Sequence, residues 1–241
     1  MNLKISIAHL YPSLLNLYGD IGNVITLKKR CEWRGIEVEF DEINIGDELK
    51  PHDLYFIGGG QDKQQEEVAN EMFKNKDFFV SERDSGSVFL GICGGYQLFG
   101  HYYQPADKEK LFGASLIDAY TVAGRKRFIG NVTVSANIEG IDTLVGFENH
   151  SGLTYLEGDT KPLGTVEVGN GNNGKDRTEG ARYKNVFGTY LHGSLLPKNP
   201  KFADYLISLA LEKRYGRKIV LSKLDDDFEN ETHEVLVGKP Y

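Results

Sequence analysis

Cys93 is the residue with the clearest chemical potential, and it lies in the segment GICGGYQ, residues 91–97. Glycines flank it where an apolar, strand-like run at residues 87–90 gives way to a helix-like run. This is the layout of a nucleophile elbow, in which the start of the helix favours an anion and offers amides to an oxyanion. The alternative is a buried structural cysteine, the common state of an isolated one. Because a packed core has no need of the flanking glycines, we expect Cys93 to be a nucleophile.

A second glycine cluster, Gly58, Gly59 and Gly60, ends the apolar run at residues 54–57. If the two apolar runs are neighbouring parallel strands, this cluster and Cys93 lie at the same carboxyl edge, where such sheets bind ligands. The glycine N–H groups could then complete an oxyanion hole. The alternative is an ordinary turn, since glycine is the usual residue there.

A thiol nucleophile normally needs a base, and the chain has six histidines. His192 is the best placed, because it follows the apolar run at residues 186–190 and so would reach the same sheet edge. His150, in the segment GFENHSG at residues 146–152, is second. Against both stands the fact that a loop histidine is more often a surface or hydrogen-bonded residue.

Other kinds of site are not predicted. The segment GNGNNGK at residues 169–175 has the spacing of a phosphate-binding loop, but Asp176 replaces the Ser or Thr that holds magnesium and no helix pattern follows. Histidines, cysteines and carboxylates do not have the spacing of a metal site. A net charge of −7 argues against a nucleic-acid partner.

Composition also bears on location. Two cysteines cannot form a disulfide framework, and the first residues lack the layout of a signal peptide. No apolar stretch approaches the roughly 20 residues needed to span a bilayer. We expect a cytoplasmic protein without a transmembrane segment.

Strand-like and helix-like runs alternate over the first hundred residues, which predicts an α/β fold with a mostly parallel sheet and right-handed crossovers. After Leu111 short alternating runs predict added β-structure on the same sheet, and an amphipathic helix is expected over Pro200–Tyr215. We expect one domain at residues 1–221. Residues 222–241 are expected to form a C-terminal tail, packed on the domain or at a partner interface.

Three segments, GICGGYQ, GFENHSG and YLHG (residues 190–193), occur in an order that resembles the class I glutamine amidotransferase domains of the cobyric acid synthase type. The segments LYPSLLNLYGD (residues 10–20) and KRFIGN (residues 126–131) resemble more narrowly the glutaminase subunits of lipid II isoglutaminyl synthases. The resemblance implies a three-layer, flavodoxin-like fold.

The resemblance also implies a reaction. Cys93 would attack the side-chain amide of glutamine, His192 would protonate the leaving ammonia, and the thioester would be hydrolysed to glutamate. The residues implied to bind the substrate are Arg127, Gly59, Gly60, Gly94 and Gln97. The chain itself would carry no cofactor. Ammonia would pass to a MurT-like subunit of the Mur-ligase type, which would use ATP and magnesium to amidate the D-glutamate of lipid II at the inner membrane face.

One position departs from the pattern. Many class I amidotransferases carry a Glu two residues after the histidine, and Ser194 stands there instead. Asp20 or Glu148 could supply the orienting carboxylate, or a Cys–His dyad could suffice. Three alternatives for the function stay open: amidation of a cobyrinic-acid-type substrate, another cysteine-dependent hydrolase, or a non-catalytic binding subunit.

Overall fold

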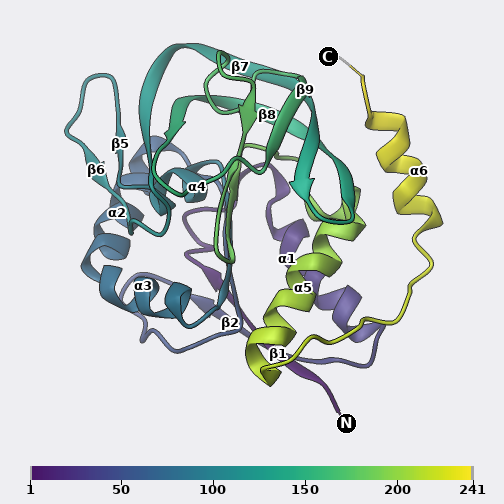
Figure 1. Cartoon of the computed structure of the whole chain (residues 1–241). Coiled ribbons are helices and arrows are strands. Elements are labelled where there is room, and N and C mark those ends of the chain that lie inside the picture. Colours follow the sequence, from purple (N-terminus) through teal and green to yellow (C-terminus); the bar gives the residue numbers. More distant parts are fainter. Residues whose placement is uncertain (1, 240–241) are drawn as a thin grey trace.

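A computed structural model describes residues 2–239. Its first sheet has the strand order β11-β12-β4-β3-β1-β2 (Figure 1). The pairs of neighbouring strands are parallel except for β11 with β12. These strands are β1 (Lys4–Leu10), β2 (Glu37–Ile43), β3 (Leu54–Ile57), β4 (Val88–Ile92), β11 (Ala181–Tyr183) and β12 (Val186–Thr189). The central strands β3 and β4 are buried along their whole length, as expected for parallel strands covered on both faces.

Helices cover both faces of this sheet. Apolar side chains of α1 (Ile21–Glu32) and α5 (Pro200–Tyr215) pack in one core cluster with residues such as Ile5 and Ile7 of β1. Those of α2 (Asp62–Lys74), α3 (Lys76–Asp84) and α4 (Gly94–Phe99) pack in the other, with Ala8 and Leu10 of the same strand. Successive side chains of a strand point to opposite faces, so β1 contributes to both clusters. The layers are helix, sheet and helix, and the predicted α/β fold is confirmed.

The added β-structure mostly forms a second sheet, so its expected place on the first sheet was wrong. The strands of the second sheet are β5 (Tyr102–Gln104), β6 (Leu111–Phe112), β7 (Ala119–Ile138), β8 (Ile141–Leu156), β9 (Gly164–Val168) and β10 (Thr178–Glu179). The reason is backbone pairing. β7 and β8 form a long hairpin and β9 pairs with the other side of β7, while the short strand β11 occupies the edge of the first sheet beside β12.

The C-terminal segment carries a helix that the sequence did not predict, α6 (Asp227–Leu236), which lies at the outer side of the molecule (Figure 1). His233 of α6 contacts Thr143 Oγ1 at 2.8 Å and the carbonyl oxygen of Lys198, in the 3-10 helix η2 (Leu196–Lys198), at 2.8 Å. The buried Arg30 of α1 donates hydrogen bonds to Asp204 of α5 and to Asp226, just before α6. These contacts attach the segment to the rest of the chain.

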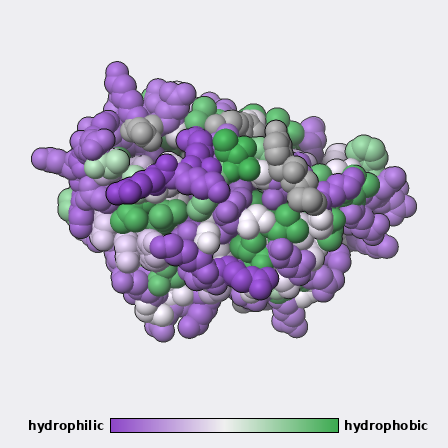
Figure 2. Space-filling view, turned by 90° about the horizontal axis from the view of Figure 1, so that it is seen from above, coloured by the Kyte–Doolittle hydropathy of each residue, from purple (hydrophilic) through white to green (hydrophobic). Residues whose placement is uncertain are grey.

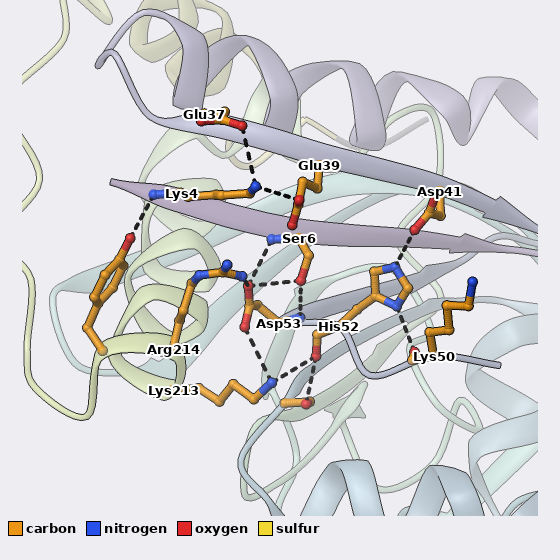
Figure 3. A network of polar contacts seen from close by, with 12 residues as sticks. Lys4, Ser6, Glu37, Glu39, Asp41, Lys50, His52, Asp53, Lys213 and Arg214 are labelled. Atoms are coloured by element: carbon orange, nitrogen blue, oxygen red, sulfur yellow. Dashed lines mark hydrogen bonds and ion pairs between the residues drawn. The ribbon is translucent and has the colours of Figure 1, made fainter. Parts of the chain in front are cut away.

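At the amino edge of the first sheet a polar network fastens α5 to the strands (Figure 3). The Asp53 carboxylate accepts hydrogen bonds from the Ser6 N–H at 2.8 Å and from Arg214 at 2.8 Å, and Lys213 Nζ lies 3.3 Å from it. Burial alone would raise the pKa of Asp53, but these donors outweigh burial and hold the pKa below its usual value. The opposite, carboxyl edge carries the site described next. None of the helices in residues 2–239 combines the length and apolar character needed to cross a membrane.

Candidate active site

Cys93 lies between β4 and α4 with backbone angles φ 50° and ψ −104°, a left-handed conformation that is uncommon for a residue with a side chain. Its N–H donates to the carbonyl oxygen of Thr189 on the neighbouring strand β12 at 2.8 Å. A β-carbon on Gly91 would lie 2.6 Å from the Phe99 ring, and one on Gly95 would lie 2.7 Å from Ile57. The motif therefore has glycine where α4 folds back tightly on the sheet, and the structure places Cys93 at a strand-to-helix turn.

His192 lies in the loop after β12 and is 1% exposed. Two hydrogen bonds with the backbone of Phe147 in β8 hold its main chain: the His192 N–H donates at 2.8 Å and its carbonyl accepts at 3.3 Å. Gly59 lies next to both His192 and Cys93, because a β-carbon on Gly59 would lie 3.0 Å from His192 Cε1 and 3.4 Å from Cys93 Cβ. Three segments that are distant in sequence thus converge at one point.

Asp20 is the carboxylate beside this point. It is fully buried just before α1, and its Oδ1 lies 3.6 Å from His192 Nδ1. Its Oδ2 accepts a hydrogen bond from the Gly59 N–H at 2.7 Å. Ser194, at the position where Glu is common, donates instead to the carbonyl oxygen of Gly19 at 2.6 Å and so joins the histidine loop to the Asp20 turn.

The charges around His192 decide its protonation. Burial alone would lower the pKa of His192, but the negative charges of Cys93 and Asp20 outweigh burial and raise the pKa. The arrangement therefore favours the imidazolium form of His192.

Glu148, the other candidate carboxylate, has a different set of partners. It accepts hydrogen bonds from the N–H groups of Asn170 and Gly171, each at 3.0 Å, and so holds that turn. His150 lies 3.9 Å from it and stacks on Tyr190 with ring centroids 3.6 Å apart. Both are buried side chains of the second sheet, and neither lines the cavity around Cys93.

A cavity of about 680 Å³ opens over Cys93 and His192. Its other lining residues are Leu17, Gly59, Gly60, Gln61, Lys63, Gln64, Arg127 and Asn149. Arg127 Nε donates to Asn149 Oδ1 at 2.7 Å, which directs the guanidinium along one wall. Sequence reasoning did not single out Asn149, Lys63 or Gln64, although the GFENHSG segment contains Asn149 and could have pointed to it.

The glycines around the cavity differ in what their N–H groups do. The Gly59 N–H donates its hydrogen bond to Asp20 Oδ2, so the Gly59 N–H is not directed at a substrate. The Gly60 N–H has no acceptor within residues 2–239. Gly94 adjoins it, since a β-carbon on Gly94 would lie 3.2 Å from Gly60 N. Gly60 and the start of α4 are therefore the better placed donors for an oxyanion.

Gln97 is brought close to the elbow but not into the cavity lining. Its buried side chain accepts a hydrogen bond from Gln65 at 2.7 Å and donates one to the Tyr190 hydroxyl at 3.0 Å. The structure thus places Gln97 behind the elbow, between α2 and Tyr190, which directly follows β12. Among the described residues, no group of three or more His, Cys, Asp and Glu side chains is arranged to hold a metal ion.

Comparison with solved structures supports the fold. A solved glutamine amidotransferase matches with a TM-score of 0.60 at 17% identity, over 84% of this chain and 98% of that one. The three-layer arrangement of helices, sheet and helices, with a cysteine at the strand-to-helix turn, is the fold of the class I glutamine amidotransferases.

Sequence comparison narrows this class. The model of the CobB/CobQ-like glutamine amidotransferase domain matches residues 6–200. The subunit GatD of lipid II isoglutaminyl synthase (glutamine-hydrolyzing) from Streptococcus pneumoniae is 40% identical over 234 residues, 96% of this chain and 90% of the relative. GatD from Staphylococcus aureus is 40% identical over 238 residues, which cover 98% of this chain and 96% of the relative. The chain belongs to the CobB/CobQ-like glutamine amidotransferase family, as its motifs predicted.

Proposed function

We propose that this chain is the glutaminase subunit of a lipid II isoglutaminyl synthase. The observation that carries the chemistry is the convergence of Cys93, His192 and the buried Asp20 around Gly59, with Cys93, His192 and Gly59 lining one cavity. The observation that supports the pathway is the 40% identity to two GatD subunits over nearly the whole of both chains.

In the proposed reaction the Cys93 thiolate attacks the carbonyl carbon of the glutamine side-chain amide. The negative charge that develops on the amide oxygen is stabilised by the N–H groups of Gly60 and Gly94. His192 as imidazolium donates its proton to the leaving nitrogen, the C–N bond breaks, and ammonia departs from a γ-glutamyl thioester. Neutral His192 then takes a proton from water, which attacks the thioester and releases glutamate and the thiolate.

Asp20 is proposed as the orienting carboxylate of this site. It faces Nδ1 of His192, so it directs the other ring nitrogen at the substrate and stabilises the imidazolium. Arg127 is proposed to bind the α-carboxylate of glutamine, because a guanidinium matches a carboxylate in shape and charge and this one lines the cavity. Gln97 is proposed to act on the substrate only through the elbow, since its own side chain is occupied by Gln65 and Tyr190.

The ammonia acceptor is proposed to lie on a second subunit, a MurT-like ligase of the Mur type. That partner would bind ATP and magnesium, activate the D-glutamate carboxylate of lipid II and receive the ammonia. This chain would act in the cytoplasm, at the inner membrane face, through the complex.

The first test is the intact mass of the purified chain after exposure to 6-diazo-5-oxo-L-norleucine, a diazo ketone that mimics glutamine. We expect a single adduct that excess glutamine prevents and that Cys93→Ser abolishes, with much slower labelling of His192→Ala. An adduct that persists in Cys93→Ser would refute the assignment of the nucleophile. Absence of any adduct, both alone and with the ligase subunit present, would favour a non-catalytic subunit.

A second test addresses the acceptor. The chain is combined with the MurT-like subunit, glutamine, ATP, magnesium and lipid II, and the stem peptide is analysed by mass spectrometry. We expect D-glutamate to become D-isoglutamine with wild-type chain and not with Cys93→Ser, while added ammonium restores the product in both. Amidation that proceeds equally with Cys93→Ser and glutamine alone would contradict the proposal.

A further inference from the structure

The strand β7 carries an irregularity beside the cavity. It pairs with β8 up to Ala123 opposite Gly152, and pairing resumes at Phe128 opposite His150. Four residues of β7, 124–127, therefore stand opposite the single residue Ser151 of β8. Extra residues in one strand of a pair leave the ladder and bend outwards. We call the residues Arg125, Lys126 and Arg127 of this irregularity the basic bulge.

The basic bulge forms part of the rim of the cavity. Arg127 is exposed and lines the cavity together with Cys93 and His192. Lys63 of α2, also exposed, lines it from another element. The cavity thus reaches the surface between cationic side chains, and a molecule that leaves it passes them.

Within residues 2–239, the exposed cations of this rim form no ion pair with a carboxylate of the same chain. In the described part of the chain, no ion pair joins Arg125, Lys126 or Lys63 to an acidic side chain. The whole chain has a net charge of −7, so a cluster of cations at this rim differs in sign from the net charge of the chain. A single substrate carboxylate needs one partner, for which Arg127 is proposed. Arg125 and Lys126 remain without a role in binding glutamine.

The molecular surface combines polar and apolar residues. Seen from above, the surface of the molecule is largely hydrophilic with smaller hydrophobic patches between (Figure 2). Ile129, two residues after the bulge on β7, exposes 52% of its surface. Protein interfaces are enriched in Arg and have a polar rim, and the basic bulge supplies two exposed arginines.

We propose that the basic bulge docks onto an acidic surface of the ATP-dependent ligase subunit and so seats that subunit over the mouth of the cavity. This inference rests on the proposed function, because it assumes that the ammonia released at Cys93 is delivered to a partner. Opposite charges would speed association and fix the orientation of the two subunits. A partner seated at this rim would receive ammonia where the cavity opens.

The test compares binding of the MurT-like subunit to three forms of the chain over a series of salt concentrations. Arg125→Glu combined with Lys126→Glu reverses the bulge and leaves Arg127 in place. Lys50→Glu combined with Lys218→Glu makes the same change in net charge at exposed positions, Lys50 just before β3 and Lys218 beyond the end of α5. We expect the bulge variant to bind at least about tenfold more weakly at low salt. The control is expected to stay within about twofold of wild type.

Salt supplies an independent readout. Screening should weaken wild-type binding as ionic strength rises, and the bulge variant should show a flatter dependence. Arg125→Gln with Lys126→Gln should fall between, which guards against misfolding of the reversed variant. Equal affinity and equal salt dependence of the bulge and control variants would overturn the inference. Loss of binding to phosphatidylglycerol vesicles, with partner affinity unchanged, would also overturn it and assign the bulge to the membrane.

Labelling with the diazo ketone separates this inference from the proposed function. We expect all variants to label at Cys93 like wild type, because none of the substituted residues contacts Cys93 or His192. If wild type itself fails to label with the partner present, the proposed function fails. If labelling is normal and only the binding difference is missing, the docking inference alone fails.

Discussion

Replacing Asp20 with Asn separates an orienting role of this carboxylate from a packing role. Asn has the same size and keeps an oxygen to accept the Gly59 N–H, now bonded at 2.7 Å. What it lacks is the negative charge that lies 3.6 Å from His192 Nδ1. We therefore expect Asp20→Asn to fold and keep its cavity but to lose part of the stabilisation of the His192 imidazolium.

The size of the effect follows from Coulomb's law. Two unit charges separated by 3.6 Å attract by roughly 4 to 5 kcal/mol at an effective dielectric constant of about 20. At about 1.4 kcal/mol for each pKa unit, this sets an upper limit of about three units on the fall in the pKa of His192. Relaxation around the neutral amide and the remaining attraction of the Cys93 thiolate reduce the effect, so we expect a fall of about one to two units.

The sign of the pH dependence is determined by the raised pKa of His192. His192 carries the proton for the leaving nitrogen at pH values below its pKa, and it loses this proton as the pH rises through the pKa. Asp20→Asn lowers the pKa, so the alkaline limb of kcat/KM for glutamine hydrolysis should move to lower pH. The pKa of His192 is raised to about 10, so the ring stays protonated at neutral pH after this fall. The rate there should drop by about 10- to 100-fold through looser orientation of the ring, less than the roughly 10⁴-fold cost of the equivalent change in a Ser-His-Asp triad, because the contact here is longer than a hydrogen bond.

The assay is glutamine hydrolysis as a function of pH, with the rate of diazo-ketone labelling as a second readout. Glu148→Gln is the matched control, since it removes the carboxylate that holds the Asn170 turn. We expect it to lower the Tm and to leave the alkaline limb in place. The reasoning is refuted if Asp20→Asn keeps the wild-type limb and rate, or if the two variants shift the limb equally.

Four further predictions concern the cavity and the scaffold. Arg127→Ala should raise the glutamine concentration needed for protection by about tenfold and leave reaction with iodoacetamide nearly unchanged; equal losses in both would refute a substrate-binding role. Gly59→Ala should slow diazo-ketone labelling by about 100-fold, because its β-carbon would lie 3.0 Å from His192 Cε1; unchanged labelling would show that the site tolerates the shift. Burial lowers the pKa of His9 to about 4, although the charge of Asp20 acts in the opposite direction. As the pH falls, His9 is therefore protonated in the unfolded chain before it is protonated in the folded chain. About 3 kcal/mol of stability should therefore be lost as the pH falls from about 6.5 to 4, and His9→Gln should flatten this dependence in urea titrations at several pH values. Arg30→Met should lower the free energy of unfolding by about 2 to 3 kcal/mol, because Asp226 loses the arginine it pairs with and Asp204 keeps only Arg34; an unchanged urea midpoint would contradict this.

Features that depend on neighbours in the chain could be predicted from the sequence. The elbow at Cys93 needs small residues immediately around it, so the segment GICGGYQ displays the requirement directly. The alternation of strand and helix over the first hundred residues predicted the parallel sheet for the same reason, since periodicity reports which face of each element is buried. The helix expected over Pro200–Tyr215 has those bounds in the structure.

Features that depend on contacts between distant segments could not be predicted this way. Asp20 and Glu148 were equal candidates in the sequence, because nothing local tells which carboxylate will face His192. Only the fold distinguishes them: the turn before α1 places Asp20 beside Gly59, while Glu148 binds the Asn170 turn. The place of the second sheet was misjudged for a related reason, because runs of alternating residues predict strands without saying which strands they pair with.

The sequence by itself thus determined the family, the nucleophile candidate and the elements that carry it, since each rests on residues adjacent in the chain. The tertiary structure decided which carboxylate meets the histidine and which glycine N–H remains open to a substrate. It also decided that Gln97 lies behind the elbow and that a basic bulge rims the cavity. These depend on where separate strands end and how they pair, and that is settled by packing across the whole molecule.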